Sequence, residues 1–127
     1  MTWTLTLESV STPRNPEALR DPLPLLDRLV RAFGQRALAR FLDIGSGTIA
    51  NWLAGKREMS LPVIKRVIDL HDVLSRALQV YAPEVVTDWL LGNDPYLDHR
   101  RPIDVLVLHG AGPLIDALDA HATFGYA

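Results

Sequence analysis

The chain has 127 residues, no cysteine and a formal net charge of −2. That length allows one modest hydrophobic core, or two small cores that share a helix, and the lack of cysteine excludes disulfides and thiolate chemistry. No apolar run is long enough to span a bilayer, and the chain does not begin with a secretory signal pattern. We therefore expect a soluble, cytoplasmic protein.

Charge is distributed unevenly along the chain. Residues 27–66 carry eight Lys or Arg against three acidic side chains, whereas residues 67–127 carry three basic and nine acidic ones. A basic segment can approach phosphates by releasing counterions, and an acidic segment suits a different partner. The pattern favours one half for nucleic acid and one for a protein, although two solvated faces would give the same counts.

A short alternating segment and a linker begin the chain. Trp3, Leu5 and Leu7 alternate with polar residues at strand spacing, and two prolines follow within residues 11–16. A lone strand has little to pair with in this chain, so it either adds to the sheet of another chain or stays mobile. We favour a flexible arm over residues 1–21.

Residues 22–61 have the pattern of a helix-turn-helix unit. A supporting helix is expected over residues 24–33, ended by Gly34, and two short helices follow. Their apolar stripes would face each other across a corner at Ile44. The first stripe is Leu38, Ala39 and Leu42, and the second is Ile49, Trp52 and Leu53.

The turn chemistry of this unit supports the same interpretation. Ser46 is placed to cap the second helix, and Gly55 can take the left-handed conformation that ends it. Asp43 stands in the corner where such units often have glycine, and Asp tolerates the left-handed conformation better than most residues.

Pro62 opens a long helix that is expected to run to about Val80 and to connect the two halves over residues 62–81. Its apolar stripe is broader than one narrow seam. Two arrangements remain open. The helix packs on two neighbours, the second being the C-terminal unit or another copy of the chain, or it has one broad core face.

Three short helices are expected in residues 82–127, each opened by proline: 83–91, 102–109 and 113–122. Glycine follows the first two, which is typical of helix ends. No strand pattern of comparable quality occurs here. The fold class predicted for the whole chain is all-α, with the helix-turn-helix unit joined by the long helix to a small helical domain.

The C-terminal half carries a family resemblance. After the helix-turn-helix pattern the chain has Trp89-Leu90-Leu91, Asn93, Leu97, His99-Arg100-Arg101-Pro102, Asp104-Val105-Leu106, Gly110 and a short aromatic tail. In this combination the chain resembles Xre/MbcA/ParS-type antitoxins over residues 25–127. The resemblance implies an antitoxin that silences a RES-domain toxin, an enzyme that consumes NAD or transfers ADP-ribose from it, encoded by the adjacent gene. The N-terminal half would repress their shared operon.

The second helix of the unit is expected to lie in the major groove of operator DNA. Its candidate base-facing residues are Ser46, Thr48 and Asn51, of which Asn51 has the donor and acceptor pair suited to adenine. Candidate phosphate contacts are Gln35, Arg36, Lys56 and Arg57. A homodimer is expected because one such unit buries little surface on DNA. Alternatively, these are ordinary surface residues of a scaffold that only dimerises.

Toxin binding is expected in residues 82–127, at the tail and at two arginines. The resemblance implies that the C-terminal end enters the nucleotide pocket of the toxin, with the tail residues Phe124, Gly125, Tyr126 and Ala127. The alternative is that Phe124 or Tyr126 folds back onto Leu118. Arg100 and Arg101 either pair with toxin carboxylates or flank the helix that starts at Pro102.

Catalysis is not expected, and no cofactor or metal is implied. His71, His99, His109 and His121 have no recurrent metal spacing, and no glycine-rich loop joins a strand to a helix. The remaining competitor is a plain helix-turn-helix repressor whose C-terminal half dimerises or senses a ligand.

Overall fold

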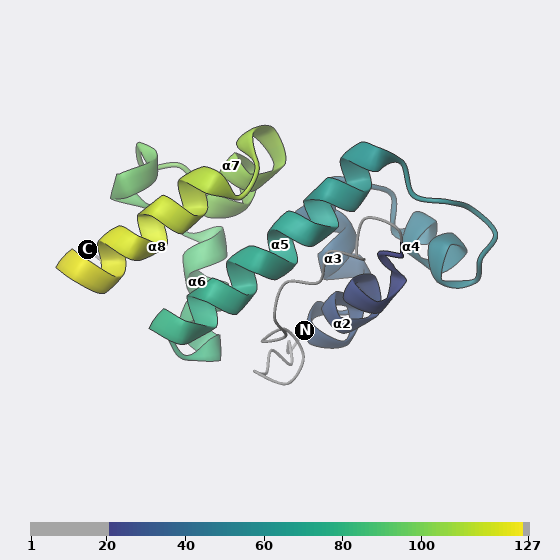
Figure 1. The fold of residues 1–127 in the computed structure, drawn as a ribbon, viewed down its shortest axis with the longest axis horizontal. Helices are drawn as coiled ribbons and strands as arrows, with labels where there is room; N and C mark the ends of the chain where they lie inside the picture. Colours follow the sequence, from purple (N-terminus) through teal and green to yellow (C-terminus); the bar gives the residue numbers. More distant parts are fainter. Residues whose placement is uncertain (1–20, 126–127) are drawn as a thin grey trace.

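The computed structural model describes residues 21–125, and for Ser46 the backbone alone. Within that range the chain is all-helical, as the sequence predicts, and holds no strand (Figure 1). The elements are α2 (Leu23–Phe33), α3 (Gln35–Leu42), α4 (Ser46–Leu53), α5 (Leu61–Val80), α6 (Pro83–Leu91), the 3-10 helix η2 (Pro95–Leu97), α7 (Pro102–His109) and α8 (Gly112–Phe124). The expected arm, apart from Asp21, lies outside the described residues, as do Tyr126 and Ala127.

Proline and glycine set most of the helix boundaries. Proline occupies the first turn of α2, α5, α6, α7 and α8, where its missing N–H leaves no hydrogen bond unmade. Gly34 and Gly110 follow α2 and α7 with φ of 83° and 81°, a conformation that side chains with a Cβ disfavour. These local signals are why the predicted boundaries agree with the structure to within one or two residues.

The long helix α5 crosses the middle of the molecule and packs on both halves of the chain (Figure 1). It contacts α2 and α3 on the N-terminal side, and α6, α7 and α8 on the C-terminal side. The structure combines the two arrangements that the sequence left open: α5 packs on neighbours from both halves of one chain, and its buried apolar residues belong to one core.

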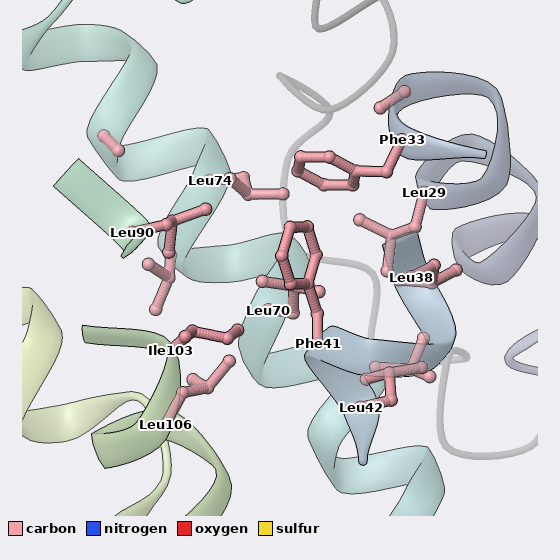
Figure 2. Packing of buried hydrophobic residues seen from close by; sticks show 14 of the residues in the cluster. Leu29, Phe33, Leu38, Phe41, Leu42, Leu70, Leu74, Leu90, Ile103 and Leu106 are labelled. Carbon is pink, nitrogen blue, oxygen red and sulfur yellow. The ribbon is translucent and has the colours of Figure 1, made fainter. Parts of the chain in front are cut away.

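One hydrophobic core runs through both halves. It extends from Leu25 in α2 to Leu118 in α8, and Figure 2 shows side chains from α2, α3, α5, α6 and α7 meeting in it. Phe33 and Phe41 meet edge to face there, with ring centroids 4.9 Å apart, a geometry that aromatic pairs favour. Because α3 also contacts α7, the expected division at residue 82 does not separate two independent cores.

Two details of the sequence prediction are wrong. Leu53, assigned to the buried stripe of the second helix, is 37% exposed, and only Ile49 and Trp52 of that stripe are buried. The last helix runs to Phe124 and not to residue 122, so part of the expected tail is helical.

Candidate functional site

The corner between α3 and α4 is built as the sequence predicts. Asp43 adopts the left-handed conformation, with φ 57° and ψ 53°, and reverses the chain at the end of α3. The amide of Ile44 then donates to the carbonyl oxygen of Ala39 at 2.9 Å. Since Ala39 is buried and small, α3 and α4 can pack closely at this point.

The helix α4 has one buried and one exposed face. Ile49 and Trp52 face the core, with 0% and 4% of their surface exposed, while Asn51 and its neighbours Gly47 and Ala50 face outward. Thr48 is half-buried. The outward face therefore presents Asn51, the residue that the sequence favours for reading a base.

The prediction that Ser46 caps α4 is wrong by one residue. Gly45 has the extended backbone of a cap residue, with φ −67° and ψ 141°, and its carbonyl accepts the first helical hydrogen bond from the amide of Thr48 at 3.1 Å. Ser46 is the first helical residue. Gly55 behaves as predicted, with a φ of 73° just after α4.

The four candidate phosphate contacts are all exposed. Gln35 and Arg36 begin α3, and Lys56 and Arg57 lie in the loop that leaves α4. Within residues 21–125 their side chains make no hydrogen bond or ion pair, which leaves three cationic groups available to an anionic partner.

The side chain of Arg101 is hydrogen-bonded within the first turn of α7. It is the N-cap residue of α7, and its guanidinium donates from Nε and Nη2 to the two carboxylate oxygens of Asp104, at 2.8 and 2.9 Å. These hydrogen bonds raise the pKa of Arg101 and lower the pKa of Asp104 relative to their ordinary values. The geometry therefore favours the second alternative for Arg101, a residue that flanks α7.

The side chain of Arg100 makes one hydrogen bond and one longer ionic contact. Its Nε donates to the carbonyl oxygen of Leu97 at 3.2 Å, and its Nη2 lies 3.9 Å from the carboxylate of Asp98. The side chain is nevertheless 48% exposed. Of the two arginines, Arg100 keeps more capacity for a partner's carboxylate.

The C-terminal end of α8 presents an aromatic side chain to solvent. Phe124 is 78% exposed, while Leu118, the residue proposed as its alternative contact, is fully buried in the core. Folding back of Phe124 onto Leu118 is therefore wrong. Gly125 ends the helix with a φ of 87°, and its amide donates to the carbonyl oxygen of His121 at 2.8 Å. The predicted contact residues Tyr126 and Ala127 lie outside the described part of the chain.

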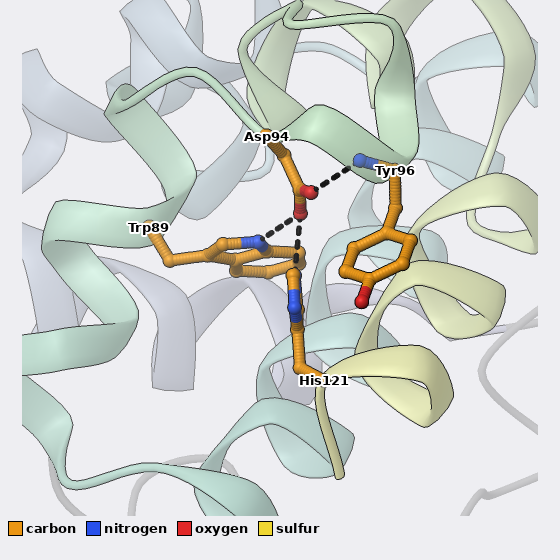
Figure 3. A network of polar contacts seen from close by, with 4 residues as sticks. All are labelled: Trp89, Asp94, Tyr96 and His121. Atoms are coloured by element: carbon orange, nitrogen blue, oxygen red, sulfur yellow. Dashed lines mark hydrogen bonds and ion pairs between the residues drawn. The ribbon is translucent and has the colours of Figure 1, made fainter. Parts of the chain in front are cut away.

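A buried polar network, which the sequence did not predict, joins α8 to α6 and to the turn at η2. The carboxylate of Asp94 accepts from the indole Nε1 of Trp89 at 2.7 Å and from the amide of Tyr96 at 2.9 Å, and lies 2.6 Å from Nε2 of His121 (Figure 3). Asp94 has no exposed surface. The Asp-Pro sequence indicates the local bond to Tyr96, because Asp often caps a turn two residues on. Nothing local indicates the partners on α6 and α8.

A cleft of about 780 Å³ separates the N-terminal and C-terminal halves on one side. Its walls come from α3, from the end of α6 and from α7, and combine apolar with charged side chains. They are Arg40, Phe41, Asp43, Leu91, Arg101, Ile103, Asp104, Val107 and Leu108. Its volume is in the range of small-molecule sites in proteins.

Among residues 21–125 no three His, Asp or Glu side chains gather in a way that would hold a metal ion. In the same range no helix has the length and apolar character needed to cross a membrane. Neither a family model, nor a curated protein, nor a solved structure matches the chain.

Proposed function

We propose that this chain is the antitoxin of a type II toxin–antitoxin pair, acting in the cytoplasm. Its C-terminal end binds and silences a RES-domain toxin, and the helix-turn-helix unit formed by α3 and α4 represses the operon that encodes both. The proposal combines the resemblance over residues 25–127 with the positions of the two exposed surfaces.

The observation that carries the proposal is the separation of these surfaces. Figure 1 places α4 at one end of the molecule and the last turn of α8 at the other. One end has exposed Asn51 with unpaired cations nearby, and the other has exposed Phe124. A protein with this layout can hold DNA and a toxin at the same time.

DNA binding would follow the usual geometry of the unit. Asn51 would contact a base edge, with Thr48 and Ser46 beside it, and Gln35, Arg36, Lys56 and Arg57 would contact phosphates and fix the register. Two copies related by symmetry would contact two half-sites, so a homodimer on a palindromic operator is expected.

The toxin would be engaged mainly through the last turn of α8 and the residues that follow. Phe124 to Ala127 would enter the nucleotide pocket, and Arg100 would pair with a carboxylate at its rim. An exposed aromatic side chain loses little on leaving solvent and gains apolar contacts in a pocket, so it suits a role as an anchor.

A growth assay tests the proposal. The adjacent reading frame is induced alone, with the intact chain, with a chain that ends at Thr123, or with the variant Phe124→Ala, while cellular NAD is followed. Rescue by the intact chain that fails with both C-terminal changes would support the proposal. Leu61→Ala is the matched control, since Leu61 is a large apolar residue, 56% exposed, on a different helix.

The competing function is a repressor that senses a small ligand, and the cleft between the halves favours it. The cleft joins α3 of the DNA-facing unit to α7, so a ligand there would touch both halves. If the neighbouring gene product is harmless, or is toxic without relief by the intact chain, this second function becomes the better account.

A further inference from the structure

The Asp94 carboxylate has more hydrogen-bond partners than the single turn contact with the amide of Tyr96. It is fully buried and lies within hydrogen-bond distance of three donor groups, from Trp89, Tyr96 and His121. A buried carboxylate is unfavourable unless its oxygens are satisfied, and three donors satisfy them. Trp89 Nε1 donates to Oδ2, and we assign a proton on Nε2 of His121 that donates to the same oxygen.

These bonds join two consecutive elements to a third that is distant in sequence. Trp89 belongs to α6, Asp94 and Tyr96 to the turn around η2, and His121 to α8. His121 lies 27 residues from Asp94 and is the last buried residue of α8, because every residue from Ala122 to Gly125 is exposed. The network of Trp89, Asp94 and His121, called here the Asp94 clamp, is thus the final anchor of the C-terminal turn.

One exposed aromatic side chain packs on this anchor, and a second follows it in the last turn of α8. The ring of Tyr96 meets the ring of His121 edge to face, with centroids 4.9 Å apart, and Tyr96 is 43% exposed. Phe124 follows His121 by three residues, which places it on the same side of α8, and it is 78% exposed. Tyr96 and Phe124 together are called the aromatic face.

The charge of the C-terminal half indicates the chemistry of the partner. Apart from the buried Asp94, residues 82–125 contain six acidic side chains against two arginines, and Asp98, just after η2, has 93% of its side chain exposed. A surface of this kind complements a cleft with basic groups that accepts planar rings, and a nucleotide-binding cleft has that character.

We infer that the Asp94 clamp orients the aromatic face for docking into a basic cleft of the partner toxin. The inference rests on the proposed function and deepens it, because it assigns Trp89, Asp94 and His121 as positioning residues and adds Tyr96 to the toxin contacts. In the free protein the clamp holds the two rings in place, so the partner gains contacts without having to order them.

The first experiment measures the clamp without any partner. In NMR spectra the wild-type chain should show a slowly exchanging Trp89 indole proton and nuclear Overhauser contacts between the rings of Tyr96 and His121. Asp94→Asn replaces one acceptor oxygen by a donor, so exchange of the indole proton should accelerate at least tenfold and the ring contacts should weaken. Asp119→Asn is the matched control on α8, because it removes one carboxylate that pairs with Arg76 outside the clamp.

The second experiment measures affinity for the purified product of the adjacent gene. Asp94→Asn and Tyr96→Ala should weaken binding at least tenfold, and Asp119→Asn should change it less than twofold. His121→Gln keeps an N–H donor and should retain more affinity than His121→Leu. Leu26→Ala, a core truncation in α2, reports the effect of lost stability alone and should leave affinity within twofold while the protein stays folded.

The outcomes separate the two proposals. The inference would be overturned if Asp94→Asn bound the neighbouring gene product as tightly as Asp119→Asn does and kept the contacts between the rings of Tyr96 and His121. If Asp94→Asn does not fold, the affinities of His121→Gln and His121→Leu for the neighbouring gene product test the inference instead. Equal affinities of these two variants would overturn the inference. If the wild-type chain does not bind the neighbouring product, the proposed function fails, and unchanged ring contacts in Asp94→Asn would still refute the clamp.

Discussion

Arg66 connects the long helix α5 to the corner between α3 and α4. Its Nη1 donates a 2.9 Å hydrogen bond to the main-chain carbonyl oxygen of Leu42, the last residue of α3. The carbonyl groups at a helix C-terminus lack intrahelical partners and carry partial negative charge, so a guanidinium is a favourable partner there. The corner is thereby held from outside the unit, by a residue of α5.

The first prediction concerns this bond. Arg66→Met keeps the length of the side chain and removes the donor, and should lower the free energy of unfolding by about 1 kcal/mol. Lys65→Met is the matched control, since Lys65 is exposed on the same helix and should change stability by less than about 0.5 kcal/mol. Urea denaturation followed by circular dichroism measures both, and equal effects would refute the assigned role of Arg66.

The second prediction concerns His71 and acid. His71 is buried in α5, its Nε2 has no hydrogen-bond partner among residues 21–125, and burial together with the nearby charge of Arg28 lowers its pKa to about 4. The unfolded chain, with an ordinary pKa of about 6.5, therefore takes up the proton first as pH falls. The stability that neutral His71 contributes should be complete above pH 6.5 and be lost between about pH 6.5 and 4, to the extent of about 2–3 kcal/mol.

His71→Leu should remove that part of the pH dependence, because the side chain no longer titrates. The measurement is the free energy of unfolding at several values between about pH 4 and 7 for the variant and the wild type. His109→Leu makes the same change at an exposed position and should leave the slope unaltered. A His71→Leu slope equal to that of the wild type would show that other groups cause the acid sensitivity.

The third prediction concerns backbone strain between η2 and α7. Asp98 and His99 both have positive φ, of 56° and 60°, although neither is glycine. Left-handed backbone is unfavourable for residues with a Cβ and least so for Asp, so His99→Gly should stabilise the protein by about 0.5–1 kcal/mol. Thermal and urea denaturation should both show that His99→Gly is more stable than the wild type.

The substitution Gly110→Ala should change the free energy of unfolding in the opposite direction. Gly110 has a φ of 81°, and a Cβ there would stand 3.4 Å from Oδ2 of Asp69, so the substitution should destabilise by about 1 kcal/mol or more. If His99→Gly destabilised the protein as much as Gly110→Ala, the strain at His99 would be refuted.

Much of the fold was predictable because its signals are local. Pro62, Pro83 and Pro102 mark helix starts, and Gly34 marks an end, each through conformational limits of the residue itself. Ser46 was misassigned because Gly45, which has no side chain to accept a hydrogen bond, takes the cap position by its backbone alone. Leu53 was misassigned because periodicity does not show how many residues a short helix can bury.

The candidate site was less predictable than the fold. The exposure of Asn51 follows from the helical period of α4, so the sequence located it correctly on the outward face. The Asp94 clamp has no such period, because its partners come from positions 5 and 27 residues away. Only the three-dimensional packing of α6 and α8 reveals that a loop carboxylate is fully buried.

The fourth prediction concerns DNA binding. If α4 reads an operator as proposed, Asn51→Ala should weaken binding to that operator by about 1–3 kcal/mol and leave binding to unrelated DNA unchanged. Lys56→Ala should instead weaken binding to both and lower the slope of log K against log salt by about 1. Arg100→Ala, in the C-terminal half and outside the cleft that borders α3, should change neither.

Fluorescence anisotropy with the upstream DNA of the gene and with a scrambled duplex, each at several salt concentrations, makes these measurements. Equal losses on both duplexes for Asn51→Ala would assign it to phosphate contact and not to base reading. If the intact chain binds neither duplex, the scaffold alternative replaces DNA recognition.

The last prediction separates folding from partner binding on a single helix. Leu118 and Phe124 both lie in α8, but Leu118 is fully buried and Phe124 is 78% exposed. Leu118→Ala should destabilise the protein by about 2–5 kcal/mol, as truncations in a packed core do, whereas Phe124→Ala should change stability by less than about 0.5 kcal/mol. If the proposed function holds, the order should reverse for binding to the toxin, because Phe124→Ala removes the proposed anchor while Leu118→Ala removes no surface group. Urea denaturation and calorimetric titration with the neighbouring gene product test the two halves of this statement. A Phe124→Ala variant as stable as the wild type that also binds as tightly would place toxin recognition elsewhere, with Arg100 the next residue to substitute.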